Sequence, residues 1–578
     1  MTTTELTSPG ATGEPAGEPR TGPTGELVWL ACELAGRHRT PAFIARLLDT
    51  DPGPVAVAIS SMSDGDPQLI RSVTADQLRL RLIELELERS ADSAALIEVH
   101  RHLAELAVPR FRHWIRLAEA ATDAGDHRLA LLAYEQAIDI VDTGTGLDDE
   151  LGPGPAIIDA TETVDRLFEY ILAAAEAAYR CGMHAGAERH VRHAIRIADR
   201  TSDPNSLARV LALRVDPGLN VDDSWLGHFD RAWDTIDPKE SPLAVELLRS
   251  QVYATYLSDP ELSIDLAGQA RRMADDLDDR QALVAALDAQ RVAAVHSNSI
   301  ELMTDAGRGL LAAARHGDRE AGAKGYEALI FGGMLSGDVD VVERNLAAYS
   351  ACAADTGIPR HQLYVLGATT LMAICRGNLD FAQERVSKAL ALATSTGDSL
   401  GIQMGFAQQA MIAIERDQMN EVMAIGDERL EQNPALRWWK LASLVATCRP
   451  GEEAAVADHL DWILPEPGAI AGWRYLWLGE LVVLADAAVM VGDRERGRVI
   501  HEALLPFTDR YATLATAVGV GSVWRPVAAL SAVLGDDERA DRQFELAEVA
   551  NRRIGAFPWL GRGRLRHAEL LHRTGRSD

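Results

Sequence analysis

The sequence is poor in aromatic residues, lysine and cysteine, and it lacks a long uninterrupted apolar run. Aromatic residues make up only 5% of its 578 residues. No stretch keeps the alternation of Val, Ile and Thr with polar residues that a half-buried β-strand needs. Ala, Leu, Arg and Glu dominate instead, and these residues favour helices. We therefore expect a protein that is nearly all helix.

The shortage of apolar runs also bears on location. The most apolar segment, near 478–492, is interrupted by Glu480 and Asp486. The N-terminus has neither the basic start nor the apolar core of a signal peptide, so we expect a cytoplasmic protein that does not enter a membrane. The five cysteines are widely spaced and odd in number, which favours reduced, buried thiols over a disulfide framework.

Positive charge is scarce. The formal net charge is −29, so a polyanion is repelled except at a local basic patch, and direct nucleic-acid binding is disfavoured. The basic residues are 4 lysines and 53 arginines. This bias is typical of GC-rich bacterial coding.

The length exceeds what one hydrophobic core supports, about 250–300 residues, so the chain must contain several domains or a repeat array. A tetratricopeptide (TPR) pattern decides for the array, because two segments carry all eight key positions at the consensus spacing. They are Trp114, Leu117, Ala118, Ala121, Gly125, Ala130, Tyr134, Ala137 and Trp524, Val527, Ala528, Ser531, Gly535, Ala540, Phe544, Ala547.

Weaker copies of the pattern lie between these two segments, at 171–194 and 366–389. The turn positions Gly337, Gly377 and Asp417 are 40 residues apart, which predicts helices longer than those of the standard 34-residue repeat. We predict an all-α fold: a TPR-like superhelix of antiparallel helix pairs, or α-solenoid, with a small helical domain at its N-terminal end.

The chain also resembles a known family. The segments ELVWLACELAGRHRTPAFIARLLDTDPGPVAVAISSM, ALIEVHRHLAELA and HWIRLAEAATDAGDHRLALLAYEQAIDI are similar to the region after the nucleotide-binding module in bacterial STAND-class regulators, including the maltose-regulator and large LuxR-type activators. The tail from Val523 to Gly575 is similar to the last repeats there. In that family a winged-helix-like piece leads into repeats that sense an inducer or partner.

The departures limit what the resemblance implies. No Gly-rich loop ends in Lys-Ser or Lys-Thr, so ATP hydrolysis is not implied. The sequence ends at Asp578, before the helix-turn-helix of the relatives, so DNA binding is not implied either. The sensing and partner-binding portion remains.

Composition divides the chain as follows. Residues 1–25 contain almost no large apolar side chain and are expected to form a disordered tail. Residues 26–108 are expected to form the small N-terminal helical domain, a winged-helix-like remnant by the resemblance. Residues 109–578 are expected to form the repeat superhelix, with irregular joints in the Gly/Pro-rich stretches 142–160 and 201–242.

Catalytic motifs are missing. There is no Gly-x-Ser-x-Gly elbow and no His-Glu-x-x-His, and the segment GVGSVW from Gly519 stops before a third dinucleotide glycine. His190 and His193 lie one turn apart with His184 nearby, but no third ligand motif follows. We expect neither enzymatic activity nor a metal or cofactor.

Two local features are candidate binding sites. The first is a concentration of aromatic residues within 40 positions, which could form a ligand or partner groove or could simply pack an irregular repeat. It comprises Trp438, Trp439, Trp462, Trp473, Tyr475 and Trp477. The second is a basic patch that could dock an acidic partner, although arginines near a terminal helix also occur without such a role. It comprises Arg552, Arg553, Arg562, Arg564 and Arg566.

The function that these features favour is that of a non-catalytic regulatory or adaptor protein in bacterial signalling or transcriptional control. Its superhelix would bind a protein or peptide partner, or a small-molecule effector. Two alternatives stay open: a structural scaffold for a biosynthetic or other multiprotein assembly, and an enzyme with an unrecognised cavity. The sequence also leaves open whether the chain forms a homo-oligomer.

Overall fold

The computed structural model describes residues 111–143, 160–213, 223–256, 258–432, 439–465, 478–514 and 517–576. The predicted tail and the predicted N-terminal helical domain lie outside these residues. Contacts divide the chain into two compact units, residues 1–156 and 157–578. The boundary falls within the stretch 142–160 that the sequence marks as a joint.

The described part of the first unit is one helix pair, α6 (Phe111–Asp123) and α7 (His127–Thr143). The two helices pack against each other through the small and apolar TPR positions of the first match, all of which are buried from Leu117 to Ala137 apart from the turn. Gly125 forms that turn with a φ of 74°, in the left-handed region that glycine adopts without strain. The TPR pattern read from this segment is confirmed.

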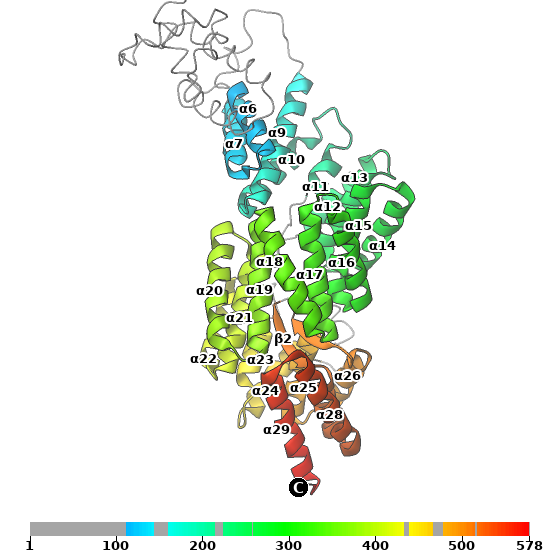
Figure 1. The fold of residues 1–578 in the computed structure, drawn as a ribbon, viewed down its shortest axis with the longest axis vertical. Coiled ribbons are helices and arrows are strands. Elements are labelled where there is room, and N and C mark those ends of the chain that lie inside the picture. Colours follow the sequence, from blue (N-terminus) through cyan, green and yellow to red (C-terminus); the bar gives the residue numbers. More distant parts are fainter. Residues whose placement is uncertain are drawn as a thin grey trace, which may run out of the picture. The chain divides into compact units, whose positions relative to one another are not determined.

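The second unit is a continuous array of helices (Figure 1). Its first helices are α9 (Ala160–Arg180), α10 (His184–Ala198), α11 (Ser206–Ala212), α12 (Asp223–Thr235), α13 (Pro242–Thr255), α14 (Pro260–Leu277), α15 (Arg280–Ser297), α16 (Ile300–Ala314), α17 (Arg319–Ser336) and α18 (Val339–Thr356). They continue with α19 (Pro359–Cys375), α20 (Leu379–Thr396), α21 (Ser399–Glu415), α22 (Met419–Gln432), α23 (Trp439–Thr447) and α24 (Glu453–Ile463). The last are α25 (Leu478–Val491), α26 (Arg494–Leu504), α27 (Trp524–Leu534), α28 (Asp537–Ile554) and α29 (Phe557–Arg573).

A turn every 19 or 20 residues separates the helices in the middle of this array. Each turn holds one residue at positive φ: Asp278, Asn298, Gly317, Gly337, Gly357, Gly377, Gly397 and Asp417. In most of these turns an Asp or Ser follows at once, and its side chain accepts a hydrogen bond from the third backbone N–H of the next helix. One residue therefore ends a helix and the next begins another, which explains the predicted 40-residue period.

The odd-numbered helices form the inner layer of the array. Helix α13 contacts α15, α15 contacts α17, α17 contacts α19, and α19 contacts α21. Small residues also allow close packing within the helix pairs: a Cβ at Gly325 on α17 would lie 3.0 Å from the backbone oxygen of Gly307 on α16. The all-α, TPR-like antiparallel helix-pair superhelix expected from the sequence is therefore the observed fold.

The last TPR match supplies a stability test. Ala540 on α28 is fully buried against α27. We expect Ala540→Leu to lower the free energy of unfolding by about 1–3 kcal/mol, because extra methylenes in a packed core force neighbours out of place. The matched change Ala568→Leu, at an exposed position of α29, should alter it by less than about 0.5 kcal/mol. Equal urea midpoints for the two variants would contradict this packing.

The array departs from the sequence prediction at one place. Residues Tyr511–Leu514 and Val518–Ser522 form a β-hairpin, β1 and β2, after the short 3₁₀ helix η4 (Leu505–Phe507). Tyr511 pairs with Ser522 and Leu514 with Val518, with an irregularity between Ala512 and Thr513. Both strands are almost entirely buried. The sequence did not reveal them because a strand buried on both faces shows no polar alternation.

Two further predictions on the array can be compared with the structure. The stretch 201–242 contains the short helices α11 and α12 and a cis peptide bond between Asp237 and Pro238. Of the described cysteines, all have free thiols, but only Cys375 is buried, and Cys181, Cys352 and Cys448 are partly exposed.

No described helix is both long enough and apolar enough to span a membrane.

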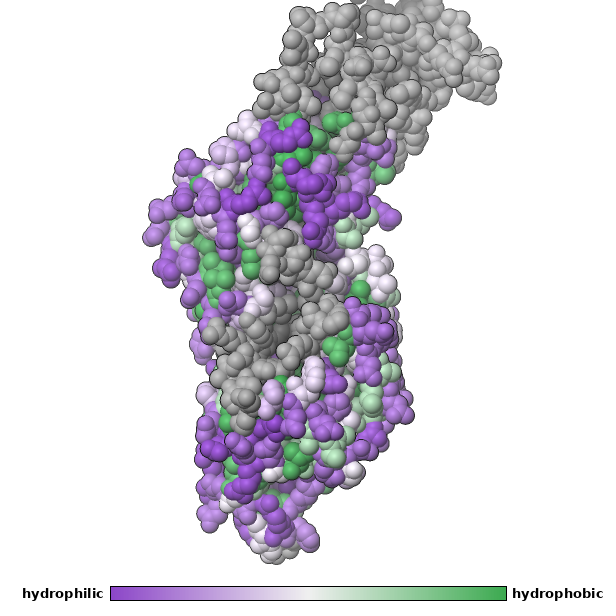
Figure 2. All heavy atoms as spheres, turned by 180° about the vertical axis from the view of Figure 1, so that it is seen from behind, coloured by the Kyte–Doolittle hydropathy of each residue, from purple (hydrophilic) through white to green (hydrophobic). Residues whose placement is uncertain are grey.

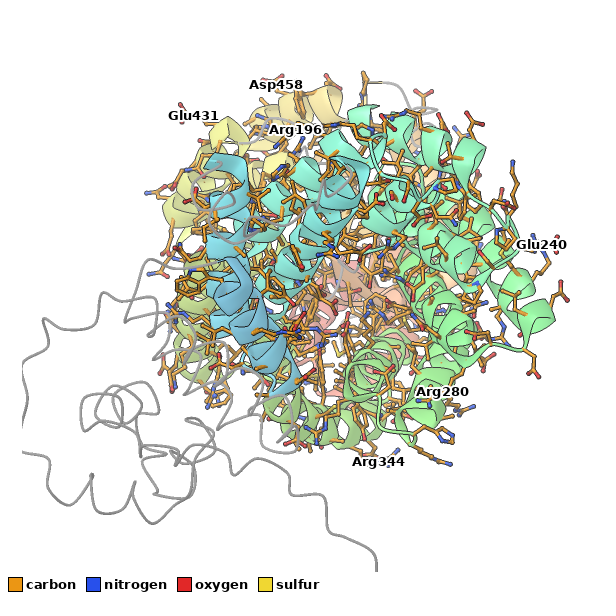
Figure 3. The ribbon with its side chains drawn as sticks, turned by 90° about the horizontal axis from the view of Figure 1, so that it is seen from above. Arg196, Glu240, Arg280, Arg344, Glu431 and Asp458 are labelled. Carbon is orange, nitrogen blue, oxygen red and sulfur yellow. The ribbon has the colours of Figure 1, made fainter. Side chains whose placement is uncertain are left out.

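Charge lies mainly on the outside of the second unit. Six exposed charged residues labelled in Figure 3 project from its periphery: Arg196, Glu240, Arg280, Arg344, Glu431 and Asp458. On the face seen in Figure 2, hydrophilic residues predominate and hydrophobic ones are scattered among them.

Candidate functional site

The β-hairpin occupies the inner side of the superhelix. It contacts α17, α19, α21 and α25, helices that come from distant parts of the chain. The Gln408 side-chain amide on α21 donates to the carbonyls of Gly367 (2.7 Å) and of Ala517 (2.8 Å), beside the hairpin turn. The Tyr511 hydroxyl lies 3.2 Å from the Cys375 sulfur on α19. These buried contacts fix the hairpin against the inner layer.

Helix α29 closes over the hairpin. Gly521 has a φ of 91°, and a Cβ there would come within 2.9 Å of the Trp559 side chain, so glycine is required for Trp559 to pack on β2. On the preceding helix α28, the Asn551 side chain accepts a hydrogen bond from the Ser522 N–H of β2 over 2.9 Å. An ion pair between Arg562 and Glu415, 2.7 Å long, joins α29 to α21 across 147 residues of sequence.

A cavity of about 630 Å³ remains between the inner helices, the hairpin and α29. Helices α13, α15, α17, α19, α21, α22, α23, α25, α27 and α29 contribute to its wall, together with β1 and β2. Its size is that of a site for a small organic molecule, about 300–1,000 Å³. The cavity belongs wholly to the second unit.

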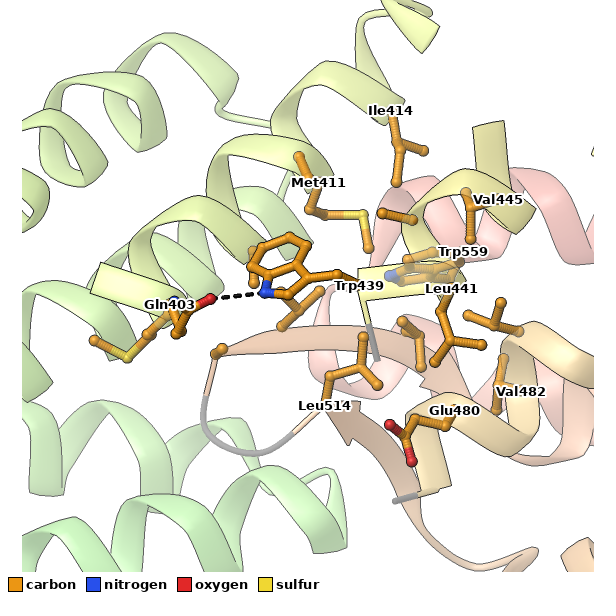
Figure 4. A pocket seen from close by; sticks show the side chains of 18 of the residues that line it. Gln403, Met411, Ile414, Trp439, Leu441, Val445, Glu480, Val482, Leu514 and Trp559 are labelled. Carbon is orange, nitrogen blue, oxygen red and sulfur yellow. Dashed lines mark hydrogen bonds between the residues drawn. The ribbon is translucent and has the colours of Figure 1, made fainter. Parts of the chain in front are cut away.

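One part of the wall is apolar and aromatic (Figure 4). Trp439 is buried there, and its indole N–H donates to the Gln403 side chain over 2.6 Å. Its neighbours in the close-up are Met411, Ile414, Leu441, Val445, Val482, Leu514 and Trp559. Besides Gln403, Glu480 is the polar residue labelled in this view, and its side chain is also buried.

The wall supplied by α13, α15, α17, α19 and the start of α21, called the polar wall here, carries ionisable side chains beside apolar ones such as Val292 and Leu363. Arg291 donates to Glu327 over 2.7 Å and to the Tyr253 hydroxyl over 2.6 Å. Burial raises the pKa of Glu327. Arg360 donates to Asp398 over 2.9 Å. Burial alone would raise the pKa of Asp398, but Arg360 holds it below its ordinary value.

A buried charge network lies behind the polar wall. Asp288, 1% exposed on α15, accepts hydrogen bonds from Lys324 (2.7 Å), Arg291 (2.9 Å) and the Tyr253 hydroxyl (3.1 Å). The guanidinium of Arg249 is 3.8 Å away. Desolvation opposes its ionisation, yet the three cations lower the pKa of Asp288 far below its ordinary value. The carboxylate is therefore charged, and it anchors α13, α15 and α17 to one another.

The structure separates the predicted aromatic cluster. Trp439 lines the cavity. Trp462 is 48% exposed on α24, with the Lys440 ammonium 5.3 Å from its ring centre, and it does not belong to the lining. Trp438, Trp473, Tyr475 and Trp477 lie outside the described residues. The groove predicted from this cluster stays a prediction for those four.

The predicted basic patch is divided in the same way. Arg562 and Arg566 line the cavity, and Arg566 pairs with Glu569 over 2.9 Å. The exposed Arg552 and Arg564 both pair with Glu548, at 2.5 and 2.7 Å, and Arg553 is exposed. The local excess of positive charge from 551 onward is thus reduced by Glu548 and Glu415, which the fold brings beside it. Docking of an acidic partner stays a prediction.

Sequence reasoning missed most of the lining. Tyr253, Arg291 and Glu327 come from three separate helices, and no short motif connects them. The signal that could have revealed these residues is charge on the inward-facing side of the odd-numbered helices. Charged residues are rarely buried without a partner, so their presence on that side indicates a polar site. Recognising them required knowing which helix of each pair lies inside.

Two observations concern nucleophilic and metal chemistry in the described part of the chain. Burial raises the pKa of the Cys448 thiol in the lining to about 12, so this thiol is a weak nucleophile near neutral pH. No group of three or more His, Cys, Asp or Glu side chains in the described part of the chain could hold a metal ion. The site combines an apolar wall with paired charges, which suits binding.

No family model and no curated protein matches the sequence. Among solved structures, yeast Tom70 is similar over 86% of this chain and 99% of its own, with 12% identity and a TM-score of 0.32. A circular tandem repeat protein with a novel repeat topology covers 95% of this chain and 98% of its own, with 16% identity and a TM-score of 0.14. Similarities this remote carry no information on binding. The fold and the site themselves define the class, an all-α TPR-like helical-repeat protein with an internal cavity.

Proposed function

We propose that this protein is a non-catalytic regulatory protein that binds a small organic effector in the cavity of its second unit. The cavity itself is the observation that supports this proposal: it has a volume of about 630 Å³ and is bounded by the inner helices, the hairpin and α29. A ligand inside would contact helices more than 250 residues apart in sequence, from Tyr253 to Glu569. Its binding could therefore change the stability of the whole array.

The hairpin argues against an extended peptide as the ligand of the inner face. A peptide on the inner side of a TPR-like array needs the surface of several inner helices, and the hairpin already covers α17, α19, α21 and α25. A protein partner would use the outer surface, where Val549 and Phe557 are 68% and 56% exposed at the end of the array. We assign the partner the role of reading out the effector, in bacterial cytoplasmic signalling or transcriptional control as the family resemblance suggests.

The test is a fluorescence titration with the uncharged apolar dye N-phenyl-1-naphthylamine. We expect saturable binding at one site. Val445 lines the apolar wall, and Val445→Trp should weaken binding at least about tenfold, a loss of about 1.4 kcal/mol, because the indole fills the space that the dye occupies. The same substitution at the exposed Val549 should change the affinity less than about twofold.

Folding must be checked beside affinity. Circular dichroism melts of both variants show whether Val445→Trp retains the array, and Ala407→Phe, at another lining position, provides a second filling variant. If the protein were a structural scaffold instead, its cavity would not be expected to bind a ligand. Absence of saturable dye binding to the wild-type chain, or equal affinity in the filled variants, would contradict the proposed function.

A further inference from the structure

The charges of the cavity wall are already paired within the protein. Each of the five arginines in the described lining has a carboxylate partner within 3 Å: Arg291 with Glu327, Arg360 with Asp398, Arg525 with Asp486, Arg562 with Glu415, and Arg566 with Glu569. The remaining lining carboxylate, Glu480, also takes part in an interaction within the protein. Every lining arginine in the described part of the wall therefore already has a carboxylate partner within the protein.

Four of these pairs include a side chain that is at most 10% exposed, whereas Arg566 and Glu569 are 44% and 52% exposed. Arg525 is 3% exposed, and its two terminal nitrogens reach the two oxygens of Asp486 at 2.7 and 2.8 Å. Such a two-pronged contact uses the planar geometry of both groups. Arg360 pairs with Asp398 over 2.9 Å, and the Asp398 side chain is 2% exposed. The same carboxylate caps α21 by accepting a hydrogen bond from the Gly401 N–H over 2.8 Å. A ligand ion would have to break such contacts to gain a partner.

An ionic ligand is therefore disfavoured by desolvation. Moving a charge from water into a largely buried site costs free energy unless a counter-charge meets it there. In this cavity an anionic ligand group would compete with carboxylates already bound to arginines, and a cationic group would compete with the arginines. Neither gain offsets the lost hydration of the ion.

The cavity is nevertheless not uniformly apolar. Around Trp439 the wall consists of Met, Ile, Leu and Val side chains. Tyr253 on α13, Tyr256 directly after it and Tyr364 on α19 line the cavity beside the ion pairs. A tyrosine hydroxyl can donate or accept a hydrogen bond, and a paired carboxylate can accept one, without requiring charge on the ligand. The two kinds of wall suit a ligand that is apolar along most of its body and polar in one part.

We propose, on the basis of the proposed function, that the effector is an uncharged amphipathic molecule. Its apolar body lies against Trp439, Met411 and Val445, and a hydroxyl- or amide-type group hydrogen-bonds to the tyrosine-bearing wall. Ligands that carry a carboxylate or an ammonium group are excluded by the internal pairing of the wall. The Arg525–Asp486 pair contributes to the preference for uncharged ligands. Asp486 already neutralises Arg525, so this buried cation cannot pair with an acidic ligand.

Three ten-carbon amphiphiles with a hydroxyl, a carboxylate or an ammonium head group test the proposal. 1-Decanol, decanoate and decylammonium are titrated, below their aggregation concentrations, against the wild-type chain loaded with N-phenyl-1-naphthylamine. We expect 1-decanol to displace the dye at concentrations at least about tenfold lower than either ion, a difference of about 1.4 kcal/mol. Because 1-decanol also partitions more readily into any apolar phase, the selectivity must then be changed by mutation.

Asp486→Asn provides that change. It keeps the size of the side chain but leaves Arg525 without its carboxylate, so decanoate should displace the dye at least about tenfold more effectively, while 1-decanol changes less than about twofold. Glu415→Gln, which removes the partner of Arg562, should act in the same direction. Asp537→Asn, in the exposed pair with Arg573 away from the lining, is the matched control and should leave all three amphiphiles unchanged.

The outcomes separate the inference from the proposed function. Wild-type preference for decanoate or decylammonium, or no gain for decanoate in both pair-breaking variants while they remain folded, would overturn the uncharged ligand and leave the cavity as a binding site. Failure of the dye itself to bind the wild-type chain would instead overturn the proposed function.

Discussion

Asp288→Ala is expected to lower the free energy of unfolding by about 3–5 kcal/mol, the largest single effect that the structure predicts. The aspartate is 1% exposed and accepts from Lys324 and Arg291 while Arg249 lies 3.8 Å away. Removing it leaves three cations in the interior with less compensation and takes an acceptor from the Tyr253 hydroxyl. Urea unfolding followed by circular dichroism measures the loss.

The matched control is Asp275→Ala on α14. Asp275 is 53% exposed and pairs with Arg271 at 3.0 Å, one helical turn away. Exposed pairs of this kind contribute little, so the variant should remain within about 0.5 kcal/mol of the wild type. Equal losses in the two variants would mean that the Asp288 network does not hold the inner helices together.

Acidification is expected to destabilise the array through His361. Burial lowers the pKa of this histidine from 6.5 to about 4, while Glu320 acts in the opposite direction and Lys324 acts with burial. The neutral ring is therefore favoured in the folded state, with the Tyr349 hydroxyl 3.2 Å from its Nδ1. As pH falls from about 6.5 to about 4, the unfolded chain binds a proton that the folded chain does not. Protonation of His361 in the unfolded chain thus lowers the free energy of unfolding by up to about 3 kcal/mol between about pH 6.5 and pH 4.

Carboxylates also titrate in acid, so the histidine contribution must be isolated. We compare the free energy of unfolding of the wild type with that of His361→Gln, which cannot titrate, at pH 7 and at pH 4.5. The wild type should lose more stability between the two pH values than the variant does. The same loss in both proteins would assign the acid sensitivity to other groups.

The local sequence contains enough information for the helix pairs. Ala118, Ala130 and Ala540 are fully buried where the TPR pattern predicts close packing, and Gly377 and Asp417 adopt positive φ at the predicted turns. These are short-range effects: a small side chain permits close helix approach, and a residue at positive φ followed by an N-cap ends one helix and begins the next. Residues within about 20 positions of one another decide them.

The binding site could not be predicted in this way. The lining of the cavity joins Tyr253 to Glu569, and the arginine cluster near the end of the chain proved to be paired in part with Glu415 and Glu548. The Trp residues that appeared as one cluster belong to different environments, with Trp439 inside and Trp462 at the surface. Residues that are close in the sequence need not be close in space here, because consecutive helices of the array alternate between its inner and outer layers.

The sequence by itself determined the all-helical class, the pairing of helices and the period of the array, because each depends on propensities, caps and small residues close together in the chain. Only the tertiary structure decided that the inner side holds a hairpin, that α29 closes over it, and that the charges of the wall are paired. Those features depend on contacts such as Gln408 with Ala517 and Arg562 with Glu415, more than 100 residues apart. Such contacts form only when the curvature of the whole array brings the helices together.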